Sequence, residues 1–72
     1  MIVSVKVKSR LFSDVEYDTL ETVKIFNSAQ YGKYIQHGAE FIDYGESEGK
    51  FYLVFRRDDV RDLFDKWCRF EL

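Results

Sequence analysis

Phe51-Tyr-Leu-Val-Phe55 is the stretch that decides the fold, because it is apolar on both faces apart from one Tyr hydroxyl and so is typical of a central β-strand. It leads into Asp58 and Asp59, whose negative charges favour the N-terminal end of a helix dipole. The apolar residues that follow have the spacing i, i+3, i+4 and i+7 of one helix face: Val60, Leu63, Phe64 and Trp67. We therefore expect a strand over about 50–57 and a final helix that ends near Arg69 or Phe70.

A second strand-then-helix unit lies twenty-nine positions earlier, where Thr22-Val-Lys-Ile-Phe26 leads into Asn27 and Ser28. Either of these two polar residues can cap a helix, and Gly38 stands where a left-handed C-terminal cap is wanted. The apolar face between the caps is formed by Tyr31, Tyr34 and Ile35. We expect a strand at about 21–26 and a helix up to about Gly38, with both tyrosines packed against the sheet.

Two further strands complete the predicted sheet. Ile2 to Lys8 alternates apolar and polar residues, which is the period of a strand with one covered face. Residues 40–45 and 50–57 form a predicted hairpin around the polar loop Gly45-Glu-Ser-Glu-Gly49. Residues 11–20 indicate an acidic connection with at most one short turn of helix. The sequence thus predicts a single α+β domain over residues 1–72, in the order ββαββα, with a four-stranded, largely antiparallel sheet and two helices.

The predicted core is drawn from the covered faces of these elements. Its members are Val3, Val5, Val7, Ile25, Phe26, Tyr34, Ile35, Phe51, Leu53, Phe55, Leu63, Phe64 and Trp67. A chain of 72 residues is near the size below which one apolar core is barely sufficient. Aromatic residues compensate for this, since they make up 18% of the chain and each can bury on the order of 150–250 Å².

Residue types that carry out catalysis are sparse. His37 is the single His and is near the end of the first predicted helix, where a capping or exposed role is the simplest interpretation. Cys68 is the single Cys, so it cannot form an internal disulfide, and we interpret it as a small apolar side chain on a helix flank. Gly45 to Lys50 resembles a phosphate-binding loop only superficially, because it leads into a strand. We predict no catalytic residues, no enzyme activity, no cofactor and no metal.

The sequence predicts a cytoplasmic protein without membrane association. It contains no run of about twenty apolar residues that would span a bilayer, and its first residues alternate instead of forming the apolar block of a signal peptide. A lone Cys fits a reducing compartment. The formal net charge of −2 argues against a general nucleic-acid binder, which is usually basic.

An acidic segment gives the main functional hypothesis. Residues 14–21 carry four carboxylates without a base, interleaved with apolar side chains. Such a segment can meet a basic surface on another protein, with charge speeding the encounter and apolar groups supplying the anchor. The predicted partner-binding residues are Asp14, Glu16, Tyr17, Asp18 and Glu21. A solvated loop is the alternative interpretation of this segment, and the protein would be a monomer or a homodimer.

A single-stranded nucleic-acid-binding module is the alternative function. Basic and aromatic side chains on one uncovered sheet face would neutralise phosphates and stack bases. The residues for this role are Lys6, Lys8, Lys24, Tyr52 and Arg56. The hypothesis requires that both helices pack on the opposite face and leave this face open.

Residues 22–69 carry a pattern of cap, turn and core positions: Asn27, Gln30, Tyr34-Ile35, Gly38, Ile42-Asp43, Gly49-Lys50, Val54-Phe55, Phe64 and Trp67. This pattern resembles a family of short proteins of unknown function from phages and prophages of Gram-positive bacteria. The resemblance implies a phage setting, no established activity and no site residues to carry over. Together with the acidic segment, it predicts a small non-enzymatic interaction protein, a phage accessory or host-modulating factor that binds a protein partner.

Overall fold

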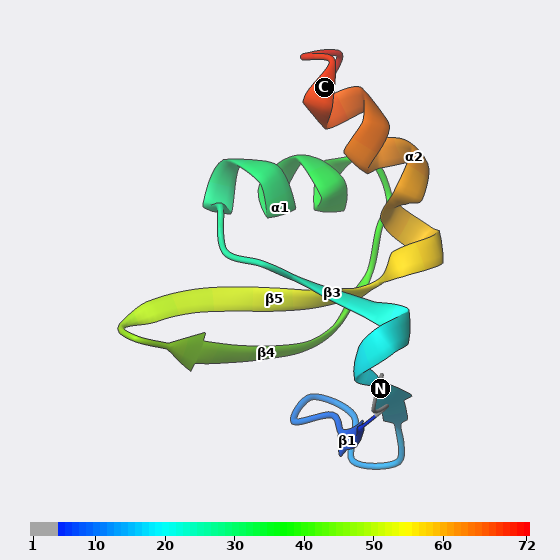
Figure 1. Ribbon diagram of the computed structural model, residues 1–72, viewed down its shortest axis with the longest axis vertical. Coiled ribbons are helices and arrows are strands. Elements are labelled where there is room, and N and C mark those ends of the chain that lie inside the picture. Colours follow the sequence, from blue (N-terminus) through cyan, green and yellow to red (C-terminus); the bar gives the residue numbers. More distant parts are fainter. Residues whose placement is uncertain (1–4) are drawn as a thin grey trace.

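The structure is a computed structural model that describes residues 5–72. Two helices, a three-stranded antiparallel sheet and a two-stranded hairpin form three successive layers (Figure 1). In chain order the elements are β1 (Lys6–Lys8), β2 (Glu16–Asp18), the 3₁₀ turn η1 (Thr19–Glu21), β3 (Thr22–Ile25), α1 (Ser28–Gln36), β4 (Phe41–Ser47), β5 (Lys50–Arg56) and α2 (Arg57–Cys68). The α+β class is confirmed, whereas the predicted single four-stranded sheet is wrong.

The central strand of the larger sheet is β5, as its apolar sequence predicts. The strand order is β3-β5-β4, and both neighbours run antiparallel to β5. Its residues are covered on both faces, since Phe55 is 0% exposed toward the helices and Val54 is 1% exposed on the other side. Burial on two faces explains why this strand has no polar alternation.

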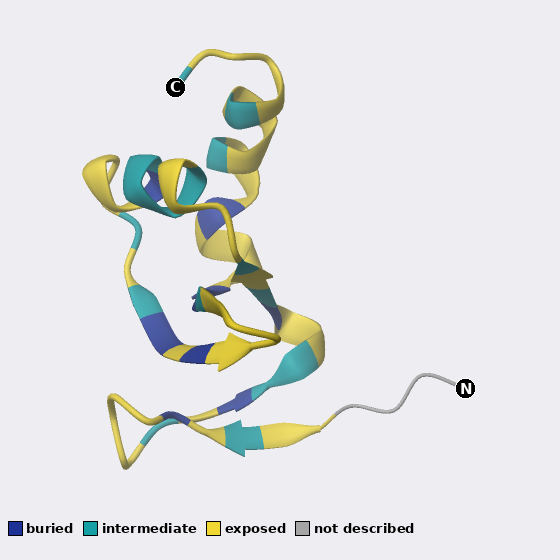
Figure 2. Ribbon diagram, turned by 90° about the vertical axis from the view of Figure 1, so that its left-hand side faces the viewer, coloured by how far each residue is buried: buried dark blue, intermediate teal, exposed yellow. Residues whose placement is uncertain are grey.

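The helix-side core joins both helices to one face of the sheet. Its fully buried members are Tyr34, Leu53, Phe55 and Val60. The rings of Tyr34 and Phe55 meet edge to face with their centroids 5.6 Å apart, a favoured geometry for aromatic pairs. Figure 2 shows buried residues where the helices meet the sheet and, separately, between the sheet and the hairpin.

A second, hairpin-side core lies on the opposite face of the sheet. Tyr17, Ile42 and Val54 are buried there, and Val7 and Tyr52 pack against them. This cluster exists because β1 pairs with β2 and turns Val7 and Tyr17 inward together. The hairpin therefore covers the sheet face that the helices leave free.

The interpretation of residues 11–20 as an acidic connection needs correction. Residues 16–18 form β2, and the expected short turn of helix is η1 at residues 19–21. A strand of three residues with one apolar member is too short to show the alternation of apolar and polar residues that identifies a strand. Its pairing with β1 therefore could not be predicted from the local sequence. The predicted first strand is observed only over Lys6–Lys8, and its first residues, including Val3, lie outside the described residues.

Both predicted caps of α1 are confirmed. The Oδ1 atom of Asn27 accepts hydrogen bonds from the backbone N–H groups of Ala29 and Gln30, at 3.0 and 3.2 Å. Gly38 has a φ of +92°, the left-handed conformation that ends the helix. The last helix begins at Arg57, one residue before Asp58, and ends at Cys68, close to the predicted end.

Five predicted core residues are exposed. They are Val5, Phe26, Ile35, Phe51 and Phe64, each more than two-fifths exposed. Apolar spacing places a side chain on a face, but it does not show whether another element covers that part of the face. Tyr34, Leu53 and Phe55 are buried as predicted, and Val7, Ile25, Leu63 and Trp67 pack as partly buried neighbours.

We expect Gly45→Ala to lower the free energy of unfolding by about 1–3 kcal/mol, the usual cost of an overpacked site. Gly45 is paired with Tyr52 across the β4–β5 ladder, and an added Cβ would lie 2.6 Å from Cζ of that ring. The Tyr52 ring cannot move away without losing its contact with the Phe26 ring, since the two ring centroids are 5.1 Å apart. Urea unfolding measures the change.

Gly32→Ala is the matched control for this prediction, because nothing lies within 4 Å of its added Cβ. In the middle of α1 it should stabilise the protein by roughly 0.5–1 kcal/mol. Equal effects at the two glycines would show that the Tyr52 ring is not the obstacle.

Candidate partner-binding surface

The acidic segment lies along the hairpin, and its members differ in exposure. Asp14, Glu16 and Glu21 are exposed. Asp18 is half-buried, and its Oδ1 atom accepts a hydrogen bond from the backbone N–H of Leu20 at 2.9 Å, which caps η1. Tyr17 is only 8% exposed and faces the sheet, so its predicted role as a contact residue requires correction.

The charges of this segment are opposed across the hairpin. The β1–β2 register places Lys6 opposite Asp18 and Lys8 opposite Glu16. All four side chains lie on the outer face, because the alternate residues point inward. Opposite charges in these positions attract one another. The outer face is therefore of mixed charge, and only Asp14 and Glu21 of the predicted acidic residues fall outside these pairs and the η1 cap.

The five residues predicted for nucleic-acid binding do not form one platform. Lys6 and Lys8 lie on the outer face of the hairpin, away from the sheet. Lys24 and Tyr52 do meet on the sheet, with the Lys24 Nζ atom 5.0 Å from the ring centroid. Arg56 lies at the other end of β5, next to α2. Both helices pack on the opposite face, as that hypothesis requires, but the hairpin occupies the face that should have been open.

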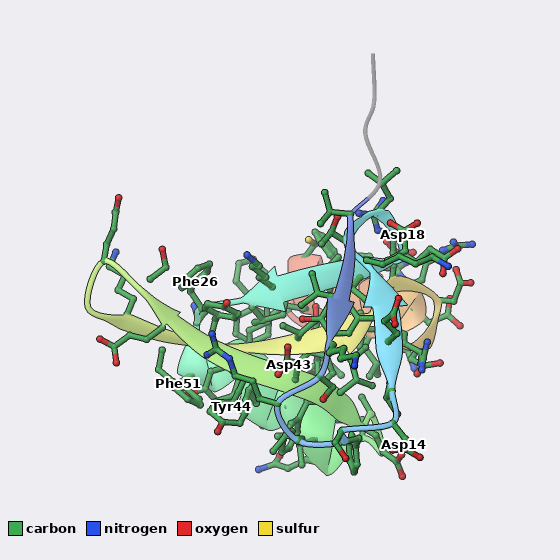
Figure 3. All side chains as sticks on the ribbon, turned by 90° about the horizontal axis from the view of Figure 1, so that it is seen from below. Asp14, Asp18, Phe26, Asp43, Tyr44 and Phe51 are labelled. Atoms are coloured by element: carbon green, nitrogen blue, oxygen red, sulfur yellow. The ribbon has the colours of Figure 1, made fainter. Side chains whose placement is uncertain are left out.

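Asp43 is a buried carboxylate that the sequence did not single out as a site residue. It is 4% exposed, and a register shift between Phe41 and Asp43 turns it toward the hairpin together with Ile42. The only local signal was an Asp inside the aromatic strand Phe41-Ile-Asp-Tyr44. Figure 3 shows Asp43 beneath the hairpin, at the centre of the sheet.

Three hydrogen bonds hold the Asp43 carboxylate. The Tyr17 hydroxyl donates to Oδ2, and the backbone N–H groups of Arg10 and Tyr44 donate to Oδ1 at 3.0 and 2.8 Å. Burial acts to raise the pKa of Asp43, but these hydrogen bonds outweigh it and hold the pKa below its ordinary value. Burial and then the neighbouring carboxylate raise the pKa of Tyr17. Asp43 is thus an ionised anchor that fastens the hairpin to β4, with both oxygens engaged.

Residues 5–72 include the single His and the single Cys of the chain. Within this range no group of three or more His, Cys, Asp and Glu side chains is placed to hold a metal ion. Cys68 and His37 are exposed at the C-terminal ends of their helices. None of the helices in this range is long and apolar enough to cross a membrane.

Aromatic side chains gather at one end of the sheet, near the β4–β5 loop. Phe26, Tyr44 and Phe51 are exposed there by 44%, 36% and 47%, and Figure 3 places all three at that end. The rings form two groups on opposite faces of the sheet. On the helix side Phe51 contacts Tyr44 and half-buried Tyr31, with centroid distances of 6.1 and 6.5 Å. On the hairpin side Phe26 contacts half-buried Tyr52, with a centroid distance of 5.1 Å. We call these five residues the aromatic end. Exposed aromatic rings held in fixed positions by neighbours are typical of protein-binding hot spots.

The two edges of the larger sheet differ. Along β4, the Ser9 hydroxyl donates to the carbonyl of Ile42, and the Arg10 guanidinium donates to the carbonyl of Tyr44 at 3.5 Å. Along the outer side of β3, no backbone hydrogen bond joins another segment among residues 5–72. The β3 edge is therefore open, whereas the β4 edge is occupied.

A concavity flanks β3 on each face. The helix-side groove, of about 430 Å³, is lined mainly by apolar side chains: Val23, Ile25, Tyr34, Val60 and Phe64. The hairpin-side cavity, of about 380 Å³, is more polar and includes Arg10, Tyr17, Thr22, Lys24, Asp43 and Tyr52. Alternate residues of β3 thus line the two spaces.

Comparisons with protein-family models, curated proteins and solved structures found no match to this chain. The resemblance of residues 22–69 to the phage family stays a prediction.

Proposed function

We propose that this protein is a non-enzymatic binding module for a protein partner, and that the aromatic end is its contact surface. The observation that carries the proposal is the exposure of Tyr44 and Phe51, whose rings stack with centroids 6.1 Å apart at one end of the sheet, with Phe26 exposed at the same end on the other face. Burying such rings against a partner supplies most of the free energy of a small interface. A phage setting, as an accessory or host-modulating factor, is part of the same proposal and rests on the resemblance alone.

The acidic segment has a secondary place in this proposal. Asp14 and Glu21 remain exposed without a cross-strand partner, so they can steer a basic partner toward the hairpin. A nucleic-acid role has weaker support, because only Lys24 and Tyr52 of its five residues meet on the sheet face.

A photo-crosslinking experiment tests the contact surface. We expect a photoreactive phenylalanine analogue at Phe51 to crosslink a defined protein in bacterial lysate, with the same analogue at exposed Lys66 of α2 as the control. Phe51→Ser should then weaken binding of the identified protein by about 30-fold, the effect of one hot-spot residue. Crosslinking to the same set of proteins from both positions would contradict a specific contact at the aromatic end.

Reversing the charges of the acidic segment tests whether the partner contacts the aromatic end or the hairpin. Asp14→Lys with Glu21→Lys should slow association and leave the crosslink at Phe51 in place, because exposed charges act mainly on the association rate. If that variant lost the crosslink while Phe51→Ser still bound the partner with unchanged affinity, the contact surface would be the hairpin and not the aromatic end.

A further inference from the structure

We propose that β3 is a docking edge for an extended segment of a partner protein in which apolar and acidic residues alternate. The segment adds to the sheet beside β3 as a fourth strand. This inference rests on the proposed function, because it states how a protein partner is held.

The backbone of β3 is free to accept such a strand. An edge strand presents a row of unpaired N–H and C=O groups, and folded proteins usually block it with a bulge, a proline, a covering segment or an outward lysine. The register of β3 against β5 runs without a bulge from Thr22 to Ile25, and no described segment covers its outer side. Its one lysine, Lys24, bends back over the Tyr52 ring. Apart from its short length of four residues, β3 therefore lacks the usual forms of protection or has them turned away from its edge.

The two concavities match the geometry of an added strand. Successive side chains of a strand point to opposite faces, as those of β3 do. Alternate side chains of the incoming segment would enter the helix-side groove beside Val23 and Ile25, where Phe64 is 45% exposed. The remaining side chains would enter the hairpin-side cavity beside Thr22 and Lys24. The groove on one face is apolar and the cavity on the other is more polar, which favours one register, because a shift of one residue would exchange the two sets.

The charges around β3 indicate acidic side chains in the second set. The hairpin-side cavity contains the cations Arg10 and Lys24 and the ionised carboxylate of Asp43, so its lining carries an excess of positive charge. At the rim of the helix-side groove, Arg61 already donates a hydrogen bond to Asp58 at 2.6 Å, and Arg57 and Asp65 are the other charged side chains. A second copy of this chain would bring its own Lys24 and Arg57 against these cations. Charge thus favours a different, acidic segment over self-pairing.

Synthetic peptides test the proposal directly. The probe is fluorescein-labelled Glu-Val-Glu-Ile-Glu-Val-Glu with a blocked C-terminus, and two companions carry Leu or Phe at the apolar positions. Fluorescence anisotropy should detect saturable binding of at least one of the three. Replacing every Glu by Lys should weaken that binding by at least about 10-fold.

Backbone methylation distinguishes strand addition from any other mode of binding. In an added strand, alternate N–H groups point toward β3 and the others point away. N-methylation of one alternate set should therefore abolish binding, and methylation of the other set should change it by less than about 2-fold. Equal effects of the two sets would overturn strand addition.

Two charge reversals on the protein provide the matched pair. Lys24→Glu should weaken peptide binding by at least about 10-fold, whereas Lys50→Glu, the same change at the far end of β5, should not. Circular dichroism verifies that both variants fold. Amide shift changes on peptide addition should follow Thr22–Ile25 and the groove residues, and changes confined to β4 would contradict the docking edge.

The outcomes separate this inference from the proposed function. If no peptide binds at millimolar concentration while the Phe51 crosslink forms, strand addition is wrong and the aromatic end stands. If the protein itself dimerises through β3 and excludes the peptide, a second copy is the occupant and the acidic segment is wrong. If peptides bind and the crosslink at Phe51 fails, the partner is held at β3 without the aromatic end.

Discussion

Phe55→Ala should leave this domain with little or no stability at room temperature. Phe55 is fully buried on the central strand, and its ring contacts those of Tyr34 and Phe41 edge to face, with centroids 5.6 and 6.5 Å away. Truncating a buried Phe to Ala costs about 3–5 kcal/mol, because contacts are lost and a cavity remains. Small domains have total stabilities near the lower end of about 5–15 kcal/mol. Circular dichroism should show the loss of cooperative unfolding.

Phe51→Ala is the control, since Phe51 is on the same strand and the same face but is 47% exposed. It should cost about 1 kcal/mol and retain a cooperative transition. If Phe55→Ala also lost less than about 2 kcal/mol, the helix-side core would not be the centre of stability.

Asp43→Ala should lower the free energy of unfolding by about 3 kcal/mol and loosen the hairpin. The substitution leaves the Tyr17 hydroxyl and the N–H groups of Arg10 and Tyr44 without their acceptor, and each unsatisfied buried group costs about 1–3 kcal/mol. Water that enters the loosened hairpin satisfies these groups in part, so the total cost for the three groups stays at about 3 kcal/mol. Urea unfolding at pH 7 measures the change, and hydrogen exchange should show faster exchange of the Ser9 and Thr19 amides.

The pH dependence gives an independent measure of the same anchor. The pKa of Asp43 in the folded protein is below its ordinary value of 3.8, so its ionised form is favoured by folding. That contribution is complete above the ordinary value and is lost as the pH falls through the lower folded-state pKa. Asp43→Asn removes the titrating group. The stability difference between the wild type and this variant should therefore shrink from pH 7 toward pH 2, and a constant difference would contradict the role of the charge.

Local signals in the sequence were sufficient for both helices and for the central strand. The Asn27 cap, the left-handed Gly38 and the apolar run that contains Leu53 act within a few residues, so they can be identified without knowing the rest of the fold. Strand β2 could not be found in this way. It has one inward residue, Tyr17, and exists only through its pairing with β1.

The candidate surface was harder to predict than the fold, because exposure and charge balance depend on distant segments. The carboxylates of Glu16 and Asp18 are opposed by lysines about ten residues earlier, which composition alone cannot show. Phe26 and Phe51 have the spacing of core residues, yet they are 44% and 47% exposed because both lie at one end of the sheet. The burial of Asp43 depends on the register shift in β4 between Phe41 and Asp43, and that shift has no clear signature in the local sequence.

The occupied β4 edge limits how these molecules can associate. A fibril grows only when each sheet offers two free edges, one for the molecule before it and one for the molecule after it. Here Ser9 and Arg10 contact β4 at Ile42 and Tyr44, so one side of the sheet is closed to strand addition at these positions. Among residues 5–72, strand addition at β3 therefore has no counterpart along β4 from Ile42 to Tyr44. The turn that carries Ser9 thus restricts growth of the sheet on one side while the edge of β3 stays open.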